Sequence, residues 1–403
     1  MSSLSQYNID IEDAVRQKNS DALQDLLRMS SSHATAAMEQ YVLQGGNVPK
    51  RLDDPWERLP EIVQKRFVTG AALNANNWVA AFDSLAEMVS QLASVVQYET
   101  AWCIPAFVTL CVDLRVVAEE ADRQLVASKK KAAKLEAAER VLKKGFALTN
   151  NDRTAIEDGS KKIGTLGIVN QLLKIYFKLN NLRLCGNLTN SVNLRSAEYF
   201  ESFPISHRAT YRYYTGRLKL YEDKYGEAVK DLEFANENLP QHLELNKRHI
   251  MLFLIPAKIL TGTLPSERML HTLNMVWFMD IVKAIRSGNM GLFNKAVEEH
   301  EEFFIRKALY LAVEKMRPLV FRSLCKRVAD MWMSNKIPLR CVERSLKVCG
   351  VGMEADEVEC MLANLIFNGY IKGYISHKVG YLVLSKKKPF PNISERSKSI
   401  IKR

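Results

Sequence analysis

The chain of 403 residues has ordinary globular composition, with 47% hydrophobic and 25% charged residues, which excludes wholesale disorder. Its 18 glycines and 12 prolines fall below average usage, and this favours long helices over a β-sandwich or barrel. The net charge of +12 is concentrated at one end: residues 311–403 hold 18 Lys and Arg against 8 Asp and Glu, and the first 310 residues hold 39 against 37. A basic end on a neutral body predicts contact with a polyanion, for which we favour nucleic acid over a merely solubilising surface.

Residues 1–160 are predicted to be a helical region, because apolar residues recur with helical spacing over Ile11–Arg28, Leu73–Val96 and Ile104–Val117. Met1–Asp10 has no apolar signal core, and no apolar run reaches the ~20 residues of a membrane span. We therefore expect neither secretion nor a membrane partner.

A charged insertion follows near residues 128–160, where lysines and glutamates alternate with alanines. The segment could be a solvated helix, but Thr149–Ser160 has few apolar residues, and we interpret it as a mobile connection before a new packed unit. Residues 161–316 then contain helices in pairs joined by short turns. One pair, Arg212–Pro240, matches the tetratricopeptide pattern in part, with Gly216 at the position where two antiparallel helices approach closely. This pattern predicts a right-handed solenoid of TPR-like helix pairs.

After Pro318 the pattern changes. Three helices are predicted, and two short strands with alternating apolar residues follow them: Leu319–Trp332, Arg340–Val348, Glu354–Phe367, then Tyr370–Ile375 and Tyr381–Leu384. Three helices and a β-hairpin form a winged helix, which we place at 317–386, followed by a polar tail at 387–403. The hairpin, Tyr370–Leu384, is called the wing below. The predicted fold class is therefore mostly α, with a solenoid followed by a C-terminal winged helix.

The third helix of this winged helix begins with carboxylates, at Glu354, Asp356, Glu357 and Glu359, which would repel phosphates. We therefore expect nucleic acid to contact the first two helices and the wing through its backbone, without sequence preference. The candidate nucleic-acid-binding residues are Arg322, Lys326, Arg340, Arg344, Lys347, Lys372, Lys378 and Lys386.

Two alternatives stay open for these residues. The arginines could instead form ion pairs with acidic helix neighbours. Tyr370 and Tyr374 could stack on exposed bases or belong to the core.

Seven cysteines without any CxxC pair indicate reduced thiols, and neither a metal site nor a cofactor is expected. Because the sequence has no phosphate loop, HExxH or GxSxG motif, we do not expect an enzyme.

A helix-pair solenoid followed by a winged helix is the layout of the PCI family, which proteasome-lid, signalosome and translation-initiation-factor subunits share. Five strings resemble, more narrowly, the PCI-domain subunit of the nuclear transcription-and-export complex, a TREX-type, pore-associated mRNA export complex. They are Val169–Lys178, Tyr213–Arg217, Glu302–Arg306, Ala363–Ile366 and Lys372–His377. The similarity spans about residues 161–391.

This resemblance implies a non-catalytic scaffold of mRNA export at the nuclear pore. The implied partners are a long helical scaffold subunit with its own winged helix, a small acidic disordered subunit, and RNA or DNA bound across the two winged helices. We place the acidic subunit on the last solenoid helices, where cations lie beside large aromatic residues: Trp277, Phe278, Lys283, Arg286, Arg306 and Lys307. The alternative is a proteasome-lid or signalosome-like subunit that makes protein–protein contacts only, a role that does not require the basic surplus.

Overall fold

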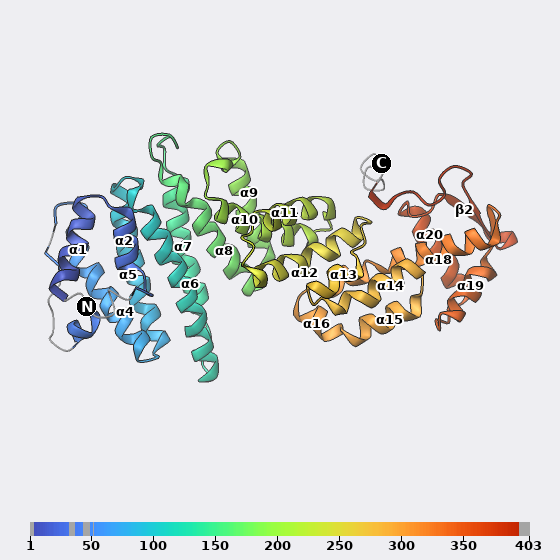
Figure 1. Cartoon of the computed structure of the whole chain (residues 1–403), viewed down its shortest axis with the longest axis horizontal. Helices are drawn as coiled ribbons and strands as arrows, with labels where there is room; N and C mark the ends of the chain where they lie inside the picture. The colour runs from blue at the N-terminus through green and yellow to red at the C-terminus, as the bar shows by residue number, and fades with distance from the viewer. Residues whose placement is uncertain (1–3, 32–36, 43–48, 51, 395–403) are drawn as a thin grey trace. The chain divides into compact units, whose positions relative to one another are not determined.

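The computed structural model describes residues 4–31, 37–42, 49–50 and 52–394 (Figure 1). The chain forms two compact units, Met1–Tyr211 and Arg212–Arg403, called unit 1 and unit 2 below. The predicted division at residue 160 does not coincide with this boundary, because helices on both sides of residue 160 pack against each other in unit 1.

Unit 1 is built from helices, apart from its loops. They are α1 (Leu4–Arg16), α2 (Ser20–Leu27), α4 (Leu59–Asn74), α5 (Trp78–Tyr98), α6 (Ile104–Ala127), α7 (Lys134–Asn150), α8 (Thr165–Lys178) and α9 (Leu182–Ser196), and α10 (Ile205–Tyr221) contains the boundary to unit 2. Short 3₁₀ turns in this unit are η1 (Trp56–Arg58), η2 (Ala101–Cys103), η3 (Lys161–Gly164) and η4 (Phe200–Ser202).

Two helical segments of unit 1, Trp78–Tyr98 and Ala101–Ala127, are long and apolar enough to cross a membrane by length and composition. Their most apolar windows are 50% and 56% buried inside the protein, and α5 and α6 pack against each other and against α7. They form the core of this unit, which accounts for their hydropathy.

Helix α7 lies in the segment that the sequence analysis assigned to a mobile connection, and that assignment is wrong for residues 134–150. Leu135, Ala138 and Leu142 recur at helical spacing and are buried, while the charged residues between them face solvent. The carboxylate of Asp122 on α6 accepts the backbone N–H groups of Ala133, Lys134 and Leu135 at 2.8–3.0 Å, so the start of α7 is capped by its neighbour.

Unit 2 begins with paired helices. They are α11 (Tyr225–Glu237), α12 (Glu244–Leu260), α13 (Glu267–Thr272), α14 (Met279–Ser287), α15 (Met290–Glu299), α16 (Glu301–Arg306) and α17 (Tyr310–Glu314), with the turn η5 (Val276–Phe278). A Cβ on Gly216 would lie 2.7 Å from Leu232 Cγ, so glycine is what permits the close approach of α10 and α11. The mostly helical fold of stacked pairs is confirmed.

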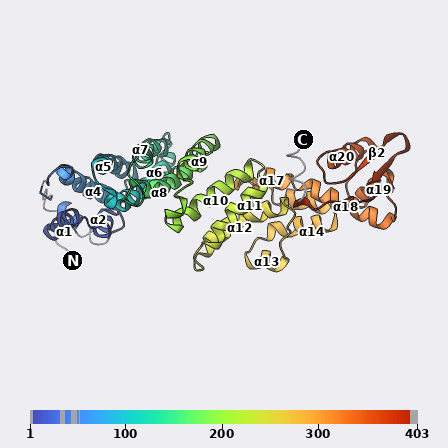
Figure 2. The same cartoon turned by 90° about the horizontal axis from the view of Figure 1, so that it is seen from above.

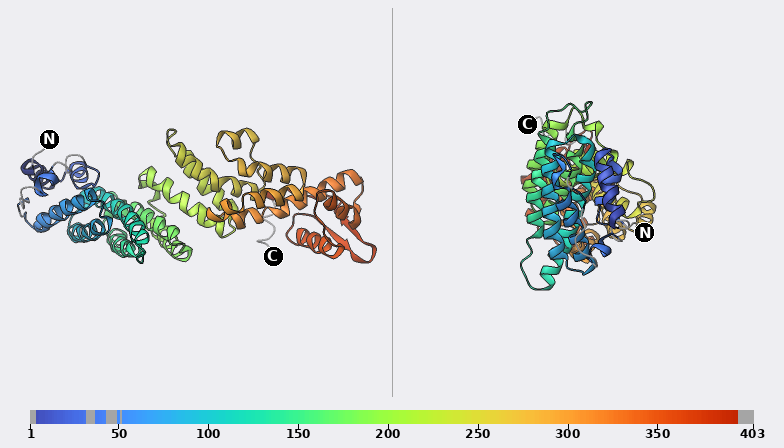
Figure 3. Two further views of the ribbon diagram at one scale, coloured as in Figure 1. Left: turned by 90° about the horizontal axis from the view of Figure 1, so that it is seen from below. Right: turned by 90° about the vertical axis from the view of Figure 1, so that its left-hand side faces the viewer.

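The winged helix completes unit 2 (Figure 2). Its elements are α18 (Arg317–Trp332), β1 (Lys336–Pro338), α19 (Leu339–Val348), α20 (Ala355–Phe367), β2 (Gly373–Ser376), η6 (His377–Val379) and β3 (Tyr381–Leu384). The sheet is antiparallel in the order β1-β3-β2, with Leu382 opposite both Ile337 and Ile375. The predicted hairpin thus gains a third strand, and β3 lies in the middle of the sheet. The red arrows in the left view of Figure 3 are strands of this sheet.

Two glycines set the contact between the solenoid helices and the winged helix. Gly288 ends α14 with φ 70°, and a Cβ there would lie 2.5 Å from the backbone N of Leu324 on α18. A Cβ on Gly291 would overlap the carbonyl oxygen of Cys349, which follows α19. Because both contacts reach the neighbouring backbone, side-chain rearrangement could not relieve an added methyl group.

Residues 387–394, which we call the strap, differ from the predicted polar tail. Phe390 and Ile393 pack against the core of unit 2, and the backbone N–H of Lys372 donates to the carbonyl of Pro389 at 2.8 Å. Ile393 lies against Gly262, just beyond the end of α12. The strap therefore joins the winged helix to the solenoid helices, whereas residues 395–403 lie outside the described part.

Candidate nucleic-acid interface and partner groove

Two carboxylates at the start of α20, those of Glu354 and Glu357, cap this helix. The backbone N–H of Glu354 donates to Glu357 Oε2 at 2.9 Å, and the Glu354 side chain accepts from the N3 backbone in return, which is a capping box. Negative charge at a helix N-terminus stabilises the helix and disfavours phosphate there. This geometry agrees with the expectation that α20 does not present its first turn to nucleic acid.

The wing is linked to α20 through one polar contact. His377 Nδ1 lies 2.9 Å from Glu359 Oε2, and the imidazole is 80% exposed. The hydrogen bond with Glu359, and then its charge, raise the pKa of His377 above its ordinary value. Protonated His377 therefore holds the wing against the third helix.

This contact predicts a pH dependence with a defined sign. Because the folded pKa of His377 is raised, its contribution is fully present below the unfolded pKa of about 6.5 and is lost as pH rises through the folded value. We expect the imidazole resonances of His377, followed by NMR across this range, to titrate at higher pH in the native chain than in Glu359→Gln. Identical titration curves would contradict the contact.

The candidate cations of α19 are mostly available. Arg340 and Arg344 are exposed and make no ion pair within the described residues. Lys347 is exposed but pairs with Glu343 Oε1 at 2.7 Å, which lowers the pKa of Glu343. The ion-pair alternative concerned the arginines, and within the described residues neither Arg340 nor Arg344 forms such a pair.

Arg322 has a structural role that the sequence analysis did not foresee. It is partly buried, its Nη2 donates to the carbonyls of Pro391 at 2.9 Å and Phe390 at 3.3 Å, and its guanidinium lies 5.9 Å from the centroid of the Phe390 ring. Burial lowers the pKa of Arg322. Because these contacts occupy the guanidinium with the strap, we remove Arg322 from the phosphate-binding set.

The remaining candidates lie around the wing and the strap. The side chains of Lys372, Lys378 and Lys386 are exposed. Lys326 is also exposed and lines, with Lys388 and Phe390 among others, a cavity of about 340 Å³ beside the strap. Lys388 was not among the predicted residues, although its place in a run of three lysines was a visible signal.

The two tyrosines of the wing region differ in solvent exposure. Tyr370 is 8% exposed and belongs to the core, whereas Tyr374 on β2 is 61% exposed. Of this pair, only Tyr374 offers its ring to a base.

The residues of the predicted partner surface on η5, α14 and α16 differ in exposure. Phe278 is fully buried against Phe304, with ring centroids 5.7 Å apart, so it cannot meet a partner. Trp277 is partly exposed but packs on Phe303 at 4.2 Å. Adjacent residues point to different sides of a turn, so the pattern of aromatics alone did not tell which one was core.

The cations of this surface also differ in availability. Lys283 pairs with Asp280 at 3.5 Å, and Arg286 Nη2 donates to the carbonyl of Pro265 at 2.9 Å. Arg306 and Lys307 are exposed and have no ion-pair partner in the described ranges. They form the part of the predicted surface that a carboxylate can reach.

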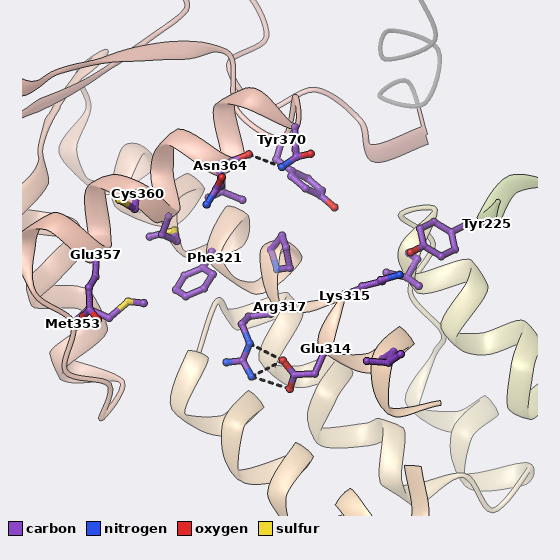
Figure 4. Close-up of a pocket in the computed structure, with 16 residues that line it drawn as sticks. Tyr225, Glu314, Lys315, Arg317, Phe321, Met353, Glu357, Cys360, Asn364 and Tyr370 are labelled. Carbon is purple, nitrogen blue, oxygen red and sulfur yellow. Dashed lines mark hydrogen bonds and ion pairs between the residues drawn. The ribbon is translucent and has the colours of Figure 1, made fainter. Parts of the chain in front are cut away.

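A groove of about 770 Å³ lies within unit 2 between α17–α18 and α20 (Figure 4). Its apolar lining includes Phe321, Met361 and Leu365. On one side, Arg317 and Glu314 form an ion pair at 2.9 Å, and on the other the amide of Asn364 lines the groove. Apolar walls with amide and carboxylate groups at the rim suit an extended peptide, and the sequence analysis did not find this feature.

The PCI domain family matches residues 297–386 of this chain. Over its whole length the chain is similar to PCI domain-containing protein 2 of Xenopus laevis, with 33% identity over 398 residues that cover 97% of this chain and 98% of the relative. The chain belongs to the family of PCI domain-containing protein 2. Further members of similar sequence are Enhanced ethylene response protein 5 of Arabidopsis thaliana (32% identity; 95% and 94% of the two chains) and Protein CSN12 homolog of Neurospora crassa (29%; 78% of each).

PCI domain proteins are in general non-catalytic scaffolds of multiprotein complexes. The resemblance to the PCI family is therefore confirmed, and the scaffold role follows at this level. The place of this PCI domain protein in an mRNA-export complex stays a prediction.

Proposed function

We propose that this PCI domain protein is a non-catalytic scaffold subunit of a nuclear, pore-associated mRNA-export complex, and that its winged helix adds a cationic surface to a nucleic-acid platform. The observation that carries the proposal is the distribution of charge. Unit 2 holds 32 Lys and Arg against 21 Asp and Glu, whereas unit 1 holds 25 against 24. Within the winged helix, Arg340, Arg344, Lys372 and Lys378 are exposed, while Glu354 and Glu357 form the capping box of α20.

Such a surface contacts phosphates rather than base edges, so binding is salt-sensitive and largely independent of sequence. The protein partners in this proposal are a long helical scaffold subunit, which brings a second winged helix, and a small acidic subunit. We place the acidic chain beside Arg306 and Lys307, next to Ile305, which is 58% exposed.

The proposal predicts the effect of reversing two charges on the wing. In the full chain, Lys372→Glu with Lys378→Glu should weaken binding of single-stranded RNA by about tenfold or more for all sequences alike, and should lower the slope of log K against log salt by about 0.7 per lost phosphate contact. Fluorescence anisotropy at several salt concentrations measures both quantities. The full chain is required because α18 packs on α14 and α15 and the strap crosses the winged helix.

A matched control is Lys230→Glu with Lys247→Glu, which changes the net charge equally at exposed lysines of α11 and α12. An equal loss of RNA affinity in both double variants would show that the loss depends on the net charge of the chain and not on the position of the lysines. An unchanged affinity in the wing variant would contradict the platform.

The second candidate is a scaffold that makes protein–protein contacts only. The groove between α17–α18 and α20 favours it, because its apolar lining suits a peptide and not a phosphate backbone. The same titrations decide between the two: a native full chain that shows no measurable binding of RNA leaves the protein-only scaffold.

A further inference from the structure

A second basic site lies in unit 1, away from the winged helix in sequence. A cavity of about 590 Å³ is formed by the end of α7, the loop after it, η3 and the end of α9. Its cationic side chains are Arg153, Lys162 and Arg195. We call it the basic pocket.

The charge of the basic pocket is not neutralised from within. None of the three cations forms an ion pair with a described residue; Arg195 donates to Asn151 Oδ1 at 2.9 Å, and Lys162 lies 5.7 Å from the centroid of the Tyr199 ring. A neutral amide and an aromatic face position these groups without cancelling their charge. The pocket therefore offers its positive charge to a ligand.

The single carboxylate of the basic pocket is already occupied. Asp152 accepts hydrogen bonds from Ser160 Oγ and Lys161 N at 2.7 Å, and from the backbone N–H and hydroxyl of Thr154 at 3.3 and 3.1 Å. Burial acts to raise the pKa of Asp152, but these hydrogen bonds outweigh it and the pKa is lowered. The carboxylate stays ionised and its oxygens accept hydrogen bonds within its own loop, and three cations against this one carboxylate leave the pocket with a net positive charge.

Asn150 supplies the second, independent observation. It is 7% exposed, it lines the basic pocket, and its Oδ1 has no hydrogen-bond partner among the residues that the structure describes. A buried acceptor without a donor is costly, so a ligand that places an N–H or O–H group here gains stabilisation. The pocket therefore suits a ligand that carries negative charge and also has a hydrogen-bond donor.

We propose that the basic pocket binds one ribonucleotide unit of RNA, with its phosphate at Arg153, Lys162 and Arg195 and its 2′-hydroxyl donating to Asn150 Oδ1. Three cations that line one cavity exceed what one carboxylate needs and match a phosphate, which presents several acceptor oxygens. The 2′-hydroxyl is a donor that DNA lacks, so the buried acceptor gives a means of distinguishing RNA from DNA. This inference rests on the proposed function in that it assumes an RNA-binding protein, but it adds a site in unit 1.

The test compares two arginines of the same helix in the full chain. Arg195→Gln removes a charge from the basic pocket, whereas Arg183→Gln removes an exposed charge from the other end of α9, outside it. With a labelled single-stranded RNA of about 12 nucleotides, we expect Arg195→Gln to weaken binding about 3- to 10-fold and to lower the salt slope by about 0.7. Arg183→Gln should leave both unchanged.

Asn150→Ala tests the 2′-hydroxyl separately. The native chain should bind RNA about 3- to 10-fold more tightly than DNA of the same sequence, and this ratio should fall to about one in Asn150→Ala without weaker DNA binding. Should this buried substitution prevent folding, the RNA-to-DNA ratio of the native chain decides the point, since a ratio of one would overturn the 2′-hydroxyl assignment.

The outcomes separate this proposal from the winged-helix platform. An effect of the wing variant without an effect of Arg195→Gln would overturn the basic pocket and leave the proposed function standing. The reverse result would support the pocket and contradict the platform. Competition by inorganic phosphate or by a phosphopeptide as strong as that by the ribonucleotide, at equal concentration, would also overturn the assignment to RNA.

Discussion

Replacing Gly288 by alanine is expected to lower the free energy of unfolding of unit 2 by about 3 kcal/mol. A residue with a Cβ loses about 1–2 kcal/mol in the left-handed region that Gly288 occupies with φ 70°. The same Cβ would lie 2.5 Å from the backbone N of Leu324, and overpacking of this kind costs a further ~1–3 kcal/mol. Urea unfolding followed by circular dichroism gives the difference between the variant and the native chain.

Gly350 provides the matched control for this prediction. Its φ is 78°, but a Cβ there would meet no atom within 4 Å. Gly350→Ala should therefore cost only the conformational part, about 1 kcal/mol. An equal loss in the free energy of unfolding at Gly288 and Gly350 would show that the close contact between α14 and α18 adds nothing to the cost of the substitution.

Removal of the strap by truncation after Ser385 is expected to destabilise unit 2 by about 3–4 kcal/mol. The truncated chain loses the apolar contacts of Phe390 and Ile393, and the N–H of Lys372 loses its acceptor. It also leaves the partly buried guanidinium of Arg322 without the two carbonyls that it contacts. Thermal and urea unfolding of the two chains measure the loss.

Truncation after Ser394 serves as the control, because it keeps every contact just named and removes only residues 395–403. We expect its unfolding midpoint to match that of the native chain. A chain ending at Ser385 that unfolds at the same urea concentration as this control would refute a stabilising role for the strap.

Local pattern was sufficient to predict the winged helix. Helical spacing predicted its three helices, and the alternation of apolar residues predicted β2 and β3. These features depend on residues close together in the chain. Helix α7 was missed because its many charged residues obscured a narrow apolar stripe. Such a stripe is sufficient to form the helix when a neighbouring helix caps its start.

Contacts between distant residues could not be predicted in the same way. Arg322 and Lys326 share one side of α18 and are equivalent in sequence, yet Arg322 binds carbonyls 68 and 69 residues away and Lys326 stays exposed. The basic pocket likewise joins Asn150, Lys162 and Arg195 from three elements. No spacing rule connects such positions, because loop geometry brings them together.

The strap also has a consequence for the order in which the protein acquires its structure during synthesis. Helices of unit 1 and the solenoid helices of unit 2 leave the ribosome first, and domains generally fold as they emerge. In contrast, the N–H of Lys372 and the guanidinium of Arg322 cannot form their hydrogen bonds to the carbonyls of Pro389 and Pro391 until those residues are synthesised. Both prolines are translated after the last strand of the winged helix. Until those residues emerge, the nascent winged helix lacks the contacts that Phe390 and Ile393 make with the core of unit 2, so its packing is completed last.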